Sequence, residues 1–355
     1  MSRRIFLVYR RGVSDITARI LTEYLQFIEM HMIAASVRTL ERDHMVVVLT
    51  PATLDRCREP NDRFRQVLEE AQQQHMHLIA LASRHFNPAD QARHIADFLD
   101  SADSFLLDYA RFEESLQPVA QLLEVTVELP PLRPEQRVQL DAQDWFERAL
   151  SLPTEDLAGK LAAYAEAIRI YPNFAEAYAR RAGAHLAKGD LETCLADCKV
   201  ALDLNPNLVE AYHNRAIAQA RQAAYVEAVA SYSEALRLDP HNSRIHLNRG
   251  VAKANLGDID GAIEDYSAAI ALNPSLAEAY FNRSLAHSQR DNFEAALQDY
   301  TRAMSLNLDA RQAADGASLT ATIAYLERML RRFPDHPQAE LVRREIMRLR
   351  DLAND

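Results

Sequence analysis

The sequence predicts an α/β domain followed by an all-α repeat domain. In the first 125 residues, four short apolar segments alternate with helical patterns, as in a parallel sheet covered by helices on both faces. In the remainder, the same residue types recur every 34 residues, which is typical of stacked helical hairpins. The chain has 355 residues, enough for two such domains.

Composition narrows the function classes. The chain is 48% hydrophobic and 26% charged, with a formal net charge of −11, which argues against nucleic-acid and membrane partners. No apolar run has the length of a membrane span. Glycine occurs eight times and forms neither GxGxxG nor GxxxxGK, so we expect no nucleotide cofactor in a loop of those types. Three cysteines in a chain of this length predict a reducing, cytoplasmic location.

The N-terminal segments predict four strands and the helices between them. The expected strands are residues 5–9, 45–50, 77–82 and 104–109. The expected helices are residues 14–29, 32–42, 61–74, 89–100 and 110–124. Because the strands are continuously apolar rather than alternating, we expect both faces of the sheet to be buried, as in a flavodoxin-like fold.

Residues 4–125 resemble a bacterial Toll/interleukin-1 receptor (TIR) domain. IFLVYRRGVS resembles the opening strand and loop of that family, and SFLLDYARFEESLQPVAQLLE resembles its last strand and helix. The most specific part is VVVLTPATLDRCREPNDRFRQVLEEA, which resembles the third strand, the loop and the following helix. The resemblance implies a domain that associates with itself or with other TIR domains. Many bacterial members also cleave NAD.

Two departures from the family pattern indicate a degenerate domain. The family helix carries Asp–Trp–x–Arg–x–Glu–x–Glu–x–Ala, whereas residues 62–71 are DRFRQVLEEA, so Val67 replaces the catalytic glutamate. Valine cannot stabilise the positive charge that develops on the ribose as nicotinamide leaves. The family's second strand and long loop are also missing after EYLQFIEMH. Glu70, about one turn after Val67, is the fallback candidate for the lost carboxylate.

The 34-residue repeat has a distinct residue type at each key position. Small residues at positions 20 and 27 allow close helix contact, an aromatic residue at position 24 fills the gap between hairpins, and a proline at position 32 ends the second helix. The pattern resembles the tetratricopeptide (TPR) repeat, which implies an α-α superhelix with a concave ligand groove. The expected repeats are residues 141–174, 175–208, 209–242, 243–276 and 277–310.

The family places its ligand groove on the first helices. Position 6 contributes a series of three asparagines after an arginine, and each amide can both donate and accept hydrogen bonds to an extended peptide. The alternative is that asparagine is common repeat filler at this position. Glutamates at position 2 would repel an acidic peptide terminus, so we expect a basic or neutral ligand. The predicted groove residues are Arg180, Asn214, Asn248, Asn282, Glu210, Glu278, Arg244, His213 and Phe281.

Five other features have structural explanations. Cys194 and Cys198 are four residues apart, but they occupy core positions of the repeat, so we expect no metal site. His75 and His77 lack an identifiable third ligand, and Cys57 has no neighbouring base to activate it. Three prolines in residues 126–140 predict an extended, semi-rigid linker. Residues 311–355 predict a partial repeat and a C-terminal capping helix.

These features favour a non-catalytic adaptor or scaffold, of a kind used in bacterial signalling or defence. Its repeats would bind a protein or peptide, and its TIR-like domain would form homo-oligomers or pair with another TIR domain. The alternative is an NAD glycohydrolase in which the repeats sense a trigger. A third hypothesis is a structural subunit that assembles by stacking its repeats.

Overall fold

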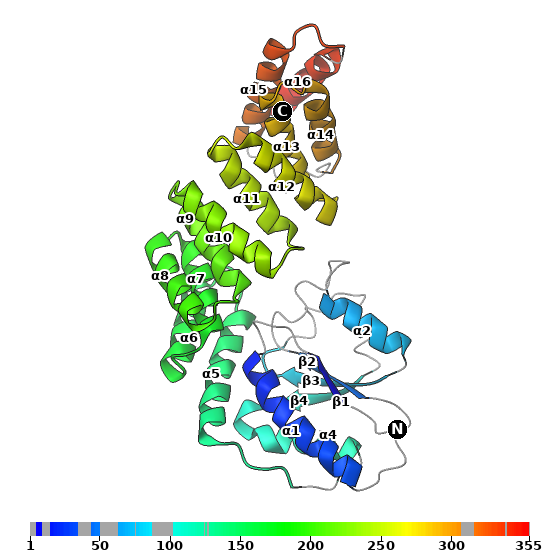
Figure 1. Cartoon of the computed structure of the whole chain (residues 1–355), viewed down its shortest axis with the longest axis vertical. Helices are drawn as coiled ribbons and strands as arrows, with labels where there is room; N and C mark the ends of the chain where they lie inside the picture. The colour runs from blue at the N-terminus through cyan, green and yellow to red at the C-terminus, as the bar shows by residue number, and fades with distance from the viewer. Residues whose placement is uncertain are drawn as a thin grey trace. The chain divides into compact units, whose positions relative to one another are not determined.

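Figure 1 shows a computed structural model of the chain. The chain divides into two compact units, Met1–Asn214 and Arg215–Asp355. The structure describes residues 5–8, 15–34, 44–49, 63–74, 76–86, 102–123, 125, 128–306, 316–337 and 339–354.

A parallel sheet forms the N-terminal part of the first unit. Across the described residues it has four strands in the order β1-β2-β3-β4. The strands are β1 (Ile5–Val8), β2 (His44–Leu49), β3 (His77–Ser83) and β4 (Asp103–Leu107). Each lies within one or two residues of an expected strand, and every residue of β2 is buried. The predicted parallel α/β architecture is therefore confirmed.

Helices cover both faces of the sheet. The face that includes Val46 packs against α1 (Asp15–Ala34) and α4 (Phe112–Leu122). The opposite face, which includes Val47, packs against α2 (Arg63–Gln73). Figure 1 shows α1 and α4 on one side of the strands and α2 on the other. This two-sided burial explains why the strands are continuously apolar.

The two consecutive crossovers have opposite handedness. Strand β1 pairs with β2, and β2 pairs with β3, so both connections step in the same direction across the sheet. Their helices, α1 and α2, nevertheless lie on opposite faces. Roughly 98% of parallel crossovers are right-handed, so one of these two is exceptional.

The segment between the sheet and the repeats is shorter and more firmly attached than expected. Helix α5 (Pro134–Ser151) begins inside the predicted linker, with proline at its first position, where a missing N–H costs nothing. The Tyr24 hydroxyl donates to the Pro130 carbonyl oxygen at 2.7 Å, and Arg133 pairs with Glu23 at 2.9 Å. The prediction of an extended linker through residue 140 is thus wrong for residues 134–140, which are helical.

Helical hairpins follow, as the 34-residue pattern predicts. In the first unit these are α5 with α6 (Leu157–Ile170) and α7 (Ala175–Lys188) with α8 (Leu191–Leu204). Helix α9 (Val209–Arg221) contains the boundary between the units. The second unit continues with α10 (Tyr225–Leu238), α11 (Ser243–Asn255), α12 (Ile259–Leu272), α13 (Ala277–Gln289), α14 (Phe293–Leu306), α15 (Gly316–Arg332) and α16 (Ala339–Asn354).

The small and aromatic repeat positions form the core between helices. Tyr266 is 2% exposed, and a Cβ on Gly250 would lie 2.6 Å from its ring, so glycine at residue 250 is what lets these helices approach. The residues at positions 20, 24 and 27 in these repeats are buried: Cys194, Ala228, Ala262, Ala296, Cys198, Tyr232, Tyr266, Tyr300, Ala201, Ala235, Ala269 and Ala303.

The C-terminal helices close the second unit. Tyr325 and Phe333 pack against Tyr300 and Phe293, so that α15 and α16 share a core with α13 and α14. A repeat stack needs such a cover because its last hairpin would otherwise expose an apolar face.

Candidate functional site

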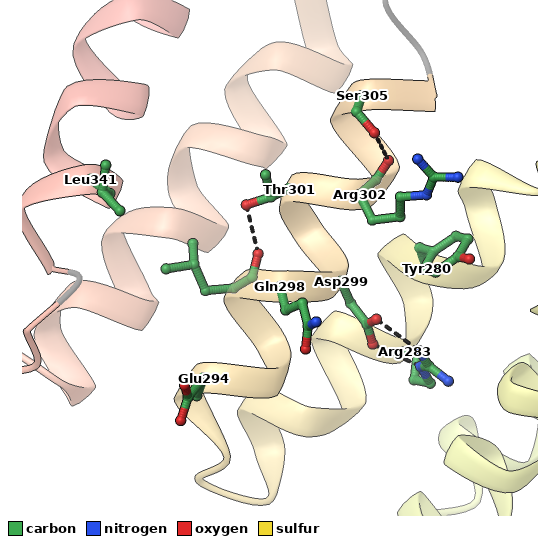
Figure 2. Close-up of a pocket in the computed structure, with 10 residues that line it drawn as sticks. Tyr280, Arg283, Glu294, Gln298, Asp299, Thr301, Arg302, Ser305 and Leu341 are labelled. Atoms are coloured by element: carbon green, nitrogen blue, oxygen red, sulfur yellow. Dashed lines mark hydrogen bonds and ion pairs between the residues drawn. The ribbon is translucent and has the colours of Figure 1, made fainter.

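Arginines at repeat position 7 connect the first helix of a hairpin to the second through hydrogen bonds. In the last full repeat, the Arg283 Nε and Nη2 atoms donate to the two carboxylate oxygens of Asp299 at 2.7 and 2.8 Å (Figure 2). Arg181 and Asp197 form the same two-bond pair, at 2.8 and 2.7 Å. These arginines therefore have a structural role.

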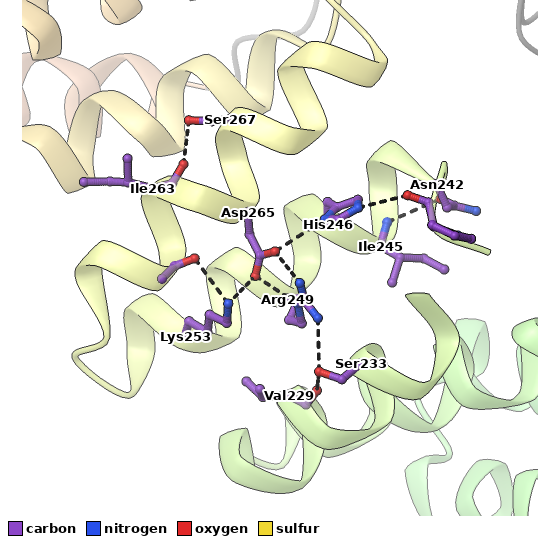
Figure 3. Close-up of polar contacts among 12 residues, drawn as sticks. Val229, Ser233, Asn242, Ile245, His246, Arg249, Lys253, Ile263, Asp265 and Ser267 are labelled. Carbon is purple, nitrogen blue, oxygen red and sulfur yellow. Dashed lines mark hydrogen bonds and ion pairs between the residues drawn. The ribbon is translucent and has the colours of Figure 1, made fainter. Parts of the chain in front are cut away.

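The position-7 arginine of the preceding repeat belongs to a larger cluster. Arg249 donates to both oxygens of Asp265, at 2.6 and 2.9 Å, and to the Ser233 hydroxyl at 3.1 Å (Figure 3). Lys253 lies 2.8 Å and His246 3.3 Å from the same carboxylate. Burial acts to raise the pKa of Asp265, but hydrogen bonds from His246, Arg249 and Lys253 outweigh burial and hold that pKa well below its usual range.

The repeat of residues 209–242 has no acid at position 23, where the neighbouring repeats have aspartate. Position 23 is Ser231, whose hydroxyl accepts from Arg215 Nε at 3.0 Å and donates to Gln219 at 2.8 Å. Arg249 and Arg283 thus pair with acids, whereas Arg215 donates to a serine.

We call the side of the second unit formed by its first helices the inner face. A small hollow of about 170 Å³ lies there, between α11 and α13. Asn282, Asn255 and Gln289 place amide groups in its wall, beside the apolar side chains of Val251 and Leu285. These five residues occupy positions 6, 9 and 13 of the first helices, where the family resemblance implied the groove. The hollow offers neutral donors and acceptors on an apolar floor, which suits a peptide backbone rather than a charged terminus.

The expected groove residues of the first unit are already engaged within the protein. Asn214 is 8% exposed, and its amide nitrogen donates to the Ala179 carbonyl oxygen at 3.1 Å. Arg180 pairs with Glu210 at 3.0 Å. Asn214 therefore connects α7 to α9, and the asparagine series does not form a row of equivalent ligand contacts.

The other expected groove residues differ in surroundings. Arg244 and Glu278 are exposed, whereas Asn248 and His213 are half-buried. The Phe281 ring packs edge-on against Tyr325, with ring centroids 6.1 Å apart, and belongs to the core beneath the C-terminal helices. Phe281 is better assigned to packing than to the groove.

Helix α2 contains Val67 and Glu70, the two residues that the TIR resemblance singled out. Val67 is half-buried and packs with the apolar cluster that includes Leu68 and Ala71. Glu70 is exposed. The preceding loop, with Cys57, and His75 both lie outside the described residues.

Other residues considered as metal ligands have structural partners. His77 lies at the start of β3, where its ring nitrogens contact His44 at 2.9 Å and Asp103 at 2.7 Å. Cys194 and Cys198 are buried in the repeat core, and neither forms a disulfide. Over the part of the chain that the structure describes, no group of three acidic, histidine or cysteine side chains could hold a metal ion.

A buried polar cluster joins α5 to the carboxyl end of the sheet. The Glu147 carboxyl group is 0% exposed, accepts from the Tyr109 hydroxyl, and accepts from Gln143 at 2.9 Å. Thr17 donates to the same tyrosine oxygen at 2.9 Å. Burial raises the pKa of Glu147 to about 7, although hydrogen bonds from Tyr109 and Gln143 oppose the shift. Nothing in the sequence pattern marks this cluster.

One turn before Glu147, Asp144 contacts Arg84 and accepts from His85 at 3.1 Å. Burial acts to raise the pKa of Asp144, but hydrogen bonds from His85 and Arg84 lower it overall. Arg84 and His85 directly follow β3, so α5 covers the carboxyl end of that strand. Polar residues at a strand end were the only signal in the sequence, and nothing there indicates a helix sixty residues later as their partner.

Comparisons with known proteins identify the repeats and leave the α/β region unassigned. Family models described as TPR repeat match residues 224–257 and 254–290, and one described as tetratricopeptide repeat matches residues 277–309. A search of curated proteins gave no match. No helix in the described ranges is both long and apolar enough to cross a membrane.

Several solved repeat proteins are similar to part of the chain. The crystal structure of MamA has 20% identity and a TM-score of 0.41, covering 44% of this chain and 92% of its own. MamA 41-end from Desulfovibrio magneticus RS-1 has 18% identity and a TM-score of 0.44, covering 48% and 96%. YrrB, titled a TPR protein with an unusual peptide-binding site, has 20% identity and a TM-score of 0.42, covering 48% and 88%. The family models thus identify tetratricopeptide repeats in the C-terminal half of the chain, over residues 224–309.

Proposed function

We propose that the protein is a non-catalytic adaptor whose repeats bind a protein or peptide ligand on the inner face of the second unit. The observation that carries this proposal is the hollow with Asn282, Asn255 and Gln289 in its wall. Amide side chains can pair with a peptide backbone in either direction, and Val251 and Leu285 supply apolar contact.

A ligand selected against the full chain tests this site. Peptides would be taken from a random display library on immobilised protein, and their dissociation constants measured by fluorescence anisotropy. We expect the double variant Asn255→Ala/Asn282→Ala to weaken binding at least tenfold, since two backbone contacts are lost, each worth about 1 kcal/mol. Asn207→Ala, which removes an exposed amide elsewhere, is the matched control. Unchanged affinity in the double variant would place the ligand on another surface.

For the α/β region we propose a degenerate TIR-like domain that has kept association and lost NAD cleavage. Val67 on α2 supports the loss of chemistry because it contributes to an apolar cluster rather than a carboxylate. The opposite handedness of the two crossovers supports the deletion of a strand after α1. Light scattering over a concentration series measures the association, and a mass equal to one chain throughout would refute it.

The competing proposal is an NAD glycohydrolase in which exposed Glu70 replaces the lost carboxylate. Incubation of purified protein with NAD, followed by chromatography for nicotinamide, separates the two. We expect no release above the buffer rate. Turnover that disappears in Glu70→Ala and persists in the control Glu69→Ala would establish the enzyme instead.

A further inference from the structure

The second helix of each repeat packs against the first helix of the next repeat, and α12 and α13 show which polar contacts form between them. Arg283 Nη1 of α13 donates to the Ser267 hydroxyl of α12 at 2.9 Å. Arg290, which follows α13, donates to Asp260 on the same helix at 2.7 Å. The two arginines are seven residues apart, as are their two acceptors, so two pairs form along one seam.

The last full repeat keeps both acceptors and loses both donors. One repeat later, the acceptor positions hold Glu294 and Thr301 on α14. Helix α15 begins at Gly316, five residues later than a strict 34-residue repeat would place it, and across the described residues no arginine bonds to either acceptor. Among the described residues, Glu294 forms no ion pair, and the Thr301 hydroxyl donates to the Leu297 carbonyl oxygen at 2.8 Å without accepting a bond.

Glu294 and Thr301 line one open hollow of about 780 Å³ (Figure 2). Leu341, which is 57% exposed, adds apolar surface to it, and Leu297 lines it at 9% exposure. Thr301 is exposed, whereas the corresponding Ser267 is half-buried beneath the next helix. The hollow therefore retains the polar and apolar contacts of a repeat interface while remaining open to solvent.

The two arginines that line the hollow do not neutralise Glu294. Arg283 is bound to Asp299 through two hydrogen bonds. The Arg302 guanidinium lies 6.0 Å from the Tyr280 ring centroid, and Figure 2 shows it at the opposite end of the hollow from Glu294. Glu294 is thus the charge in the hollow that a basic side chain can neutralise.

We propose that the surface formed by Glu294, Leu297, Thr301 and Leu341 docks a partner protein through two basic side chains about 10 Å apart, the length of two helical turns. One basic group pairs with the Glu294 carboxylate, and the other donates to the Thr301 hydroxyl, as Arg290 and Arg283 do one repeat earlier. An apolar side chain between them covers Leu297 and Leu341. This surface lies apart from the hollow of Asn282 and does not depend on it.

Stapled helical peptides provide a defined probe for the full-length protein. The first carries arginines at i and i+7 with leucine between them, and the second has the same composition with arginines at i and i+5, on different faces. Fluorescence anisotropy measures both dissociation constants. We expect the first peptide to bind at least tenfold more tightly. Equal affinities, or no binding of either peptide at millimolar concentration, would overturn the proposal.

Variants of the protein assign the two contacts. We expect Glu294→Ala and Thr301→Val each to weaken the first peptide about five- to tenfold, as loss of one hydrogen bond in a partly exposed site does. Glu264→Ala removes an exposed carboxylate outside the hollow and should leave affinity unchanged. Asn282→Ala should also have no effect, which separates this surface from the inner-face site. Wild-type affinity in Glu294→Ala would refute the ion pair.

Discussion

Glu147 lies in the polar cluster that joins α5 to the sheet, called the junction below, and Asp265 lies in the repeats. Both are buried carboxyl groups, with exposures of 0% and 3%, but the charges around them differ. Asp265 is surrounded by three basic side chains that keep it ionised. Glu147 is surrounded by neutral hydrogen-bond partners, and burial raises its pKa to about 7. The repeats therefore offset the cost of burying charge with ion pairs, whereas the junction reduces that cost by favouring the protonated acid.

Removing the acid from the repeat cluster should have the largest effect. Asp265→Ala leaves Arg249 and Lys253 half-buried beside His246 with no counter-charge, and we expect a loss of about 3–5 kcal/mol in the free energy of unfolding. Urea denaturation at pH 7 measures it. Glu264→Ala, its exposed neighbour, should change stability by less than about 0.5 kcal/mol. A loss below about 1 kcal/mol for Asp265→Ala would mean that the cluster is solvated and the comparison fails.

The junction should respond to pH with the opposite sign to the repeats. Because the pKa of Glu147 is raised from 4.5 to about 7 in the folded state, stability is highest below 4.5 and falls as pH rises through that window. The full effect is about 3 kcal/mol. Asp265, whose pKa is lowered, contributes stability that is present near neutrality and lost in acid.

Glu147→Gln tests the junction directly. The variant should match the wild type at pH 4.5 and be more stable at pH 8, by up to about 3 kcal/mol. Urea midpoints across this range give the difference, and Glu155→Gln, at an exposed acid just after α5, is the control. Parallel pH profiles for wild type and Glu147→Gln would show that Glu147 ionises normally.

Adding an acid to the repeat that lacks one should have the smallest effect. Ser231→Asp places a carboxylate opposite Arg215, as in the neighbouring repeats, and we expect a gain of up to about 1 kcal/mol at pH 7. Ser231→Asn supplies a similar shape without charge and should give no gain. A destabilised Ser231→Asp variant would indicate that the cost of burying the carboxylate exceeds the attraction at this position.

The local sequence pattern was sufficient to predict the helices and strands, but it did not predict the contacts between them. Strand β2 was predictable because the short continuous apolar run Met45–Leu49 is typical of a strand in a sheet covered on both faces. The repeat boundaries followed from the recurring small and aromatic positions. The start of α5 was missed because proline at residue 134 favours both an extended chain and a first helical turn, and the pattern alone does not decide between them.

Single residues of the predicted groove also have contacts that the repeat pattern does not predict. Asn214 and Asn282 occupy the same repeat position, yet Asn214 binds the Ala179 carbonyl oxygen and Asn282 lines a hollow. Repeat register assigns a residue to a face of its helix. What the neighbouring hairpin places opposite that face depends on side chains about 34 residues away.

By itself, the sequence determined the parallel α/β region and the tetratricopeptide repeats, because periodicity and residue type act over short stretches of chain. Only the tertiary structure decided that α5 covers the end of the sheet around Glu147 and that Glu294 and Thr301 are left without their arginines. Those features depend on pairs separated by tens of residues, whose burial and charge are set when the helices pack.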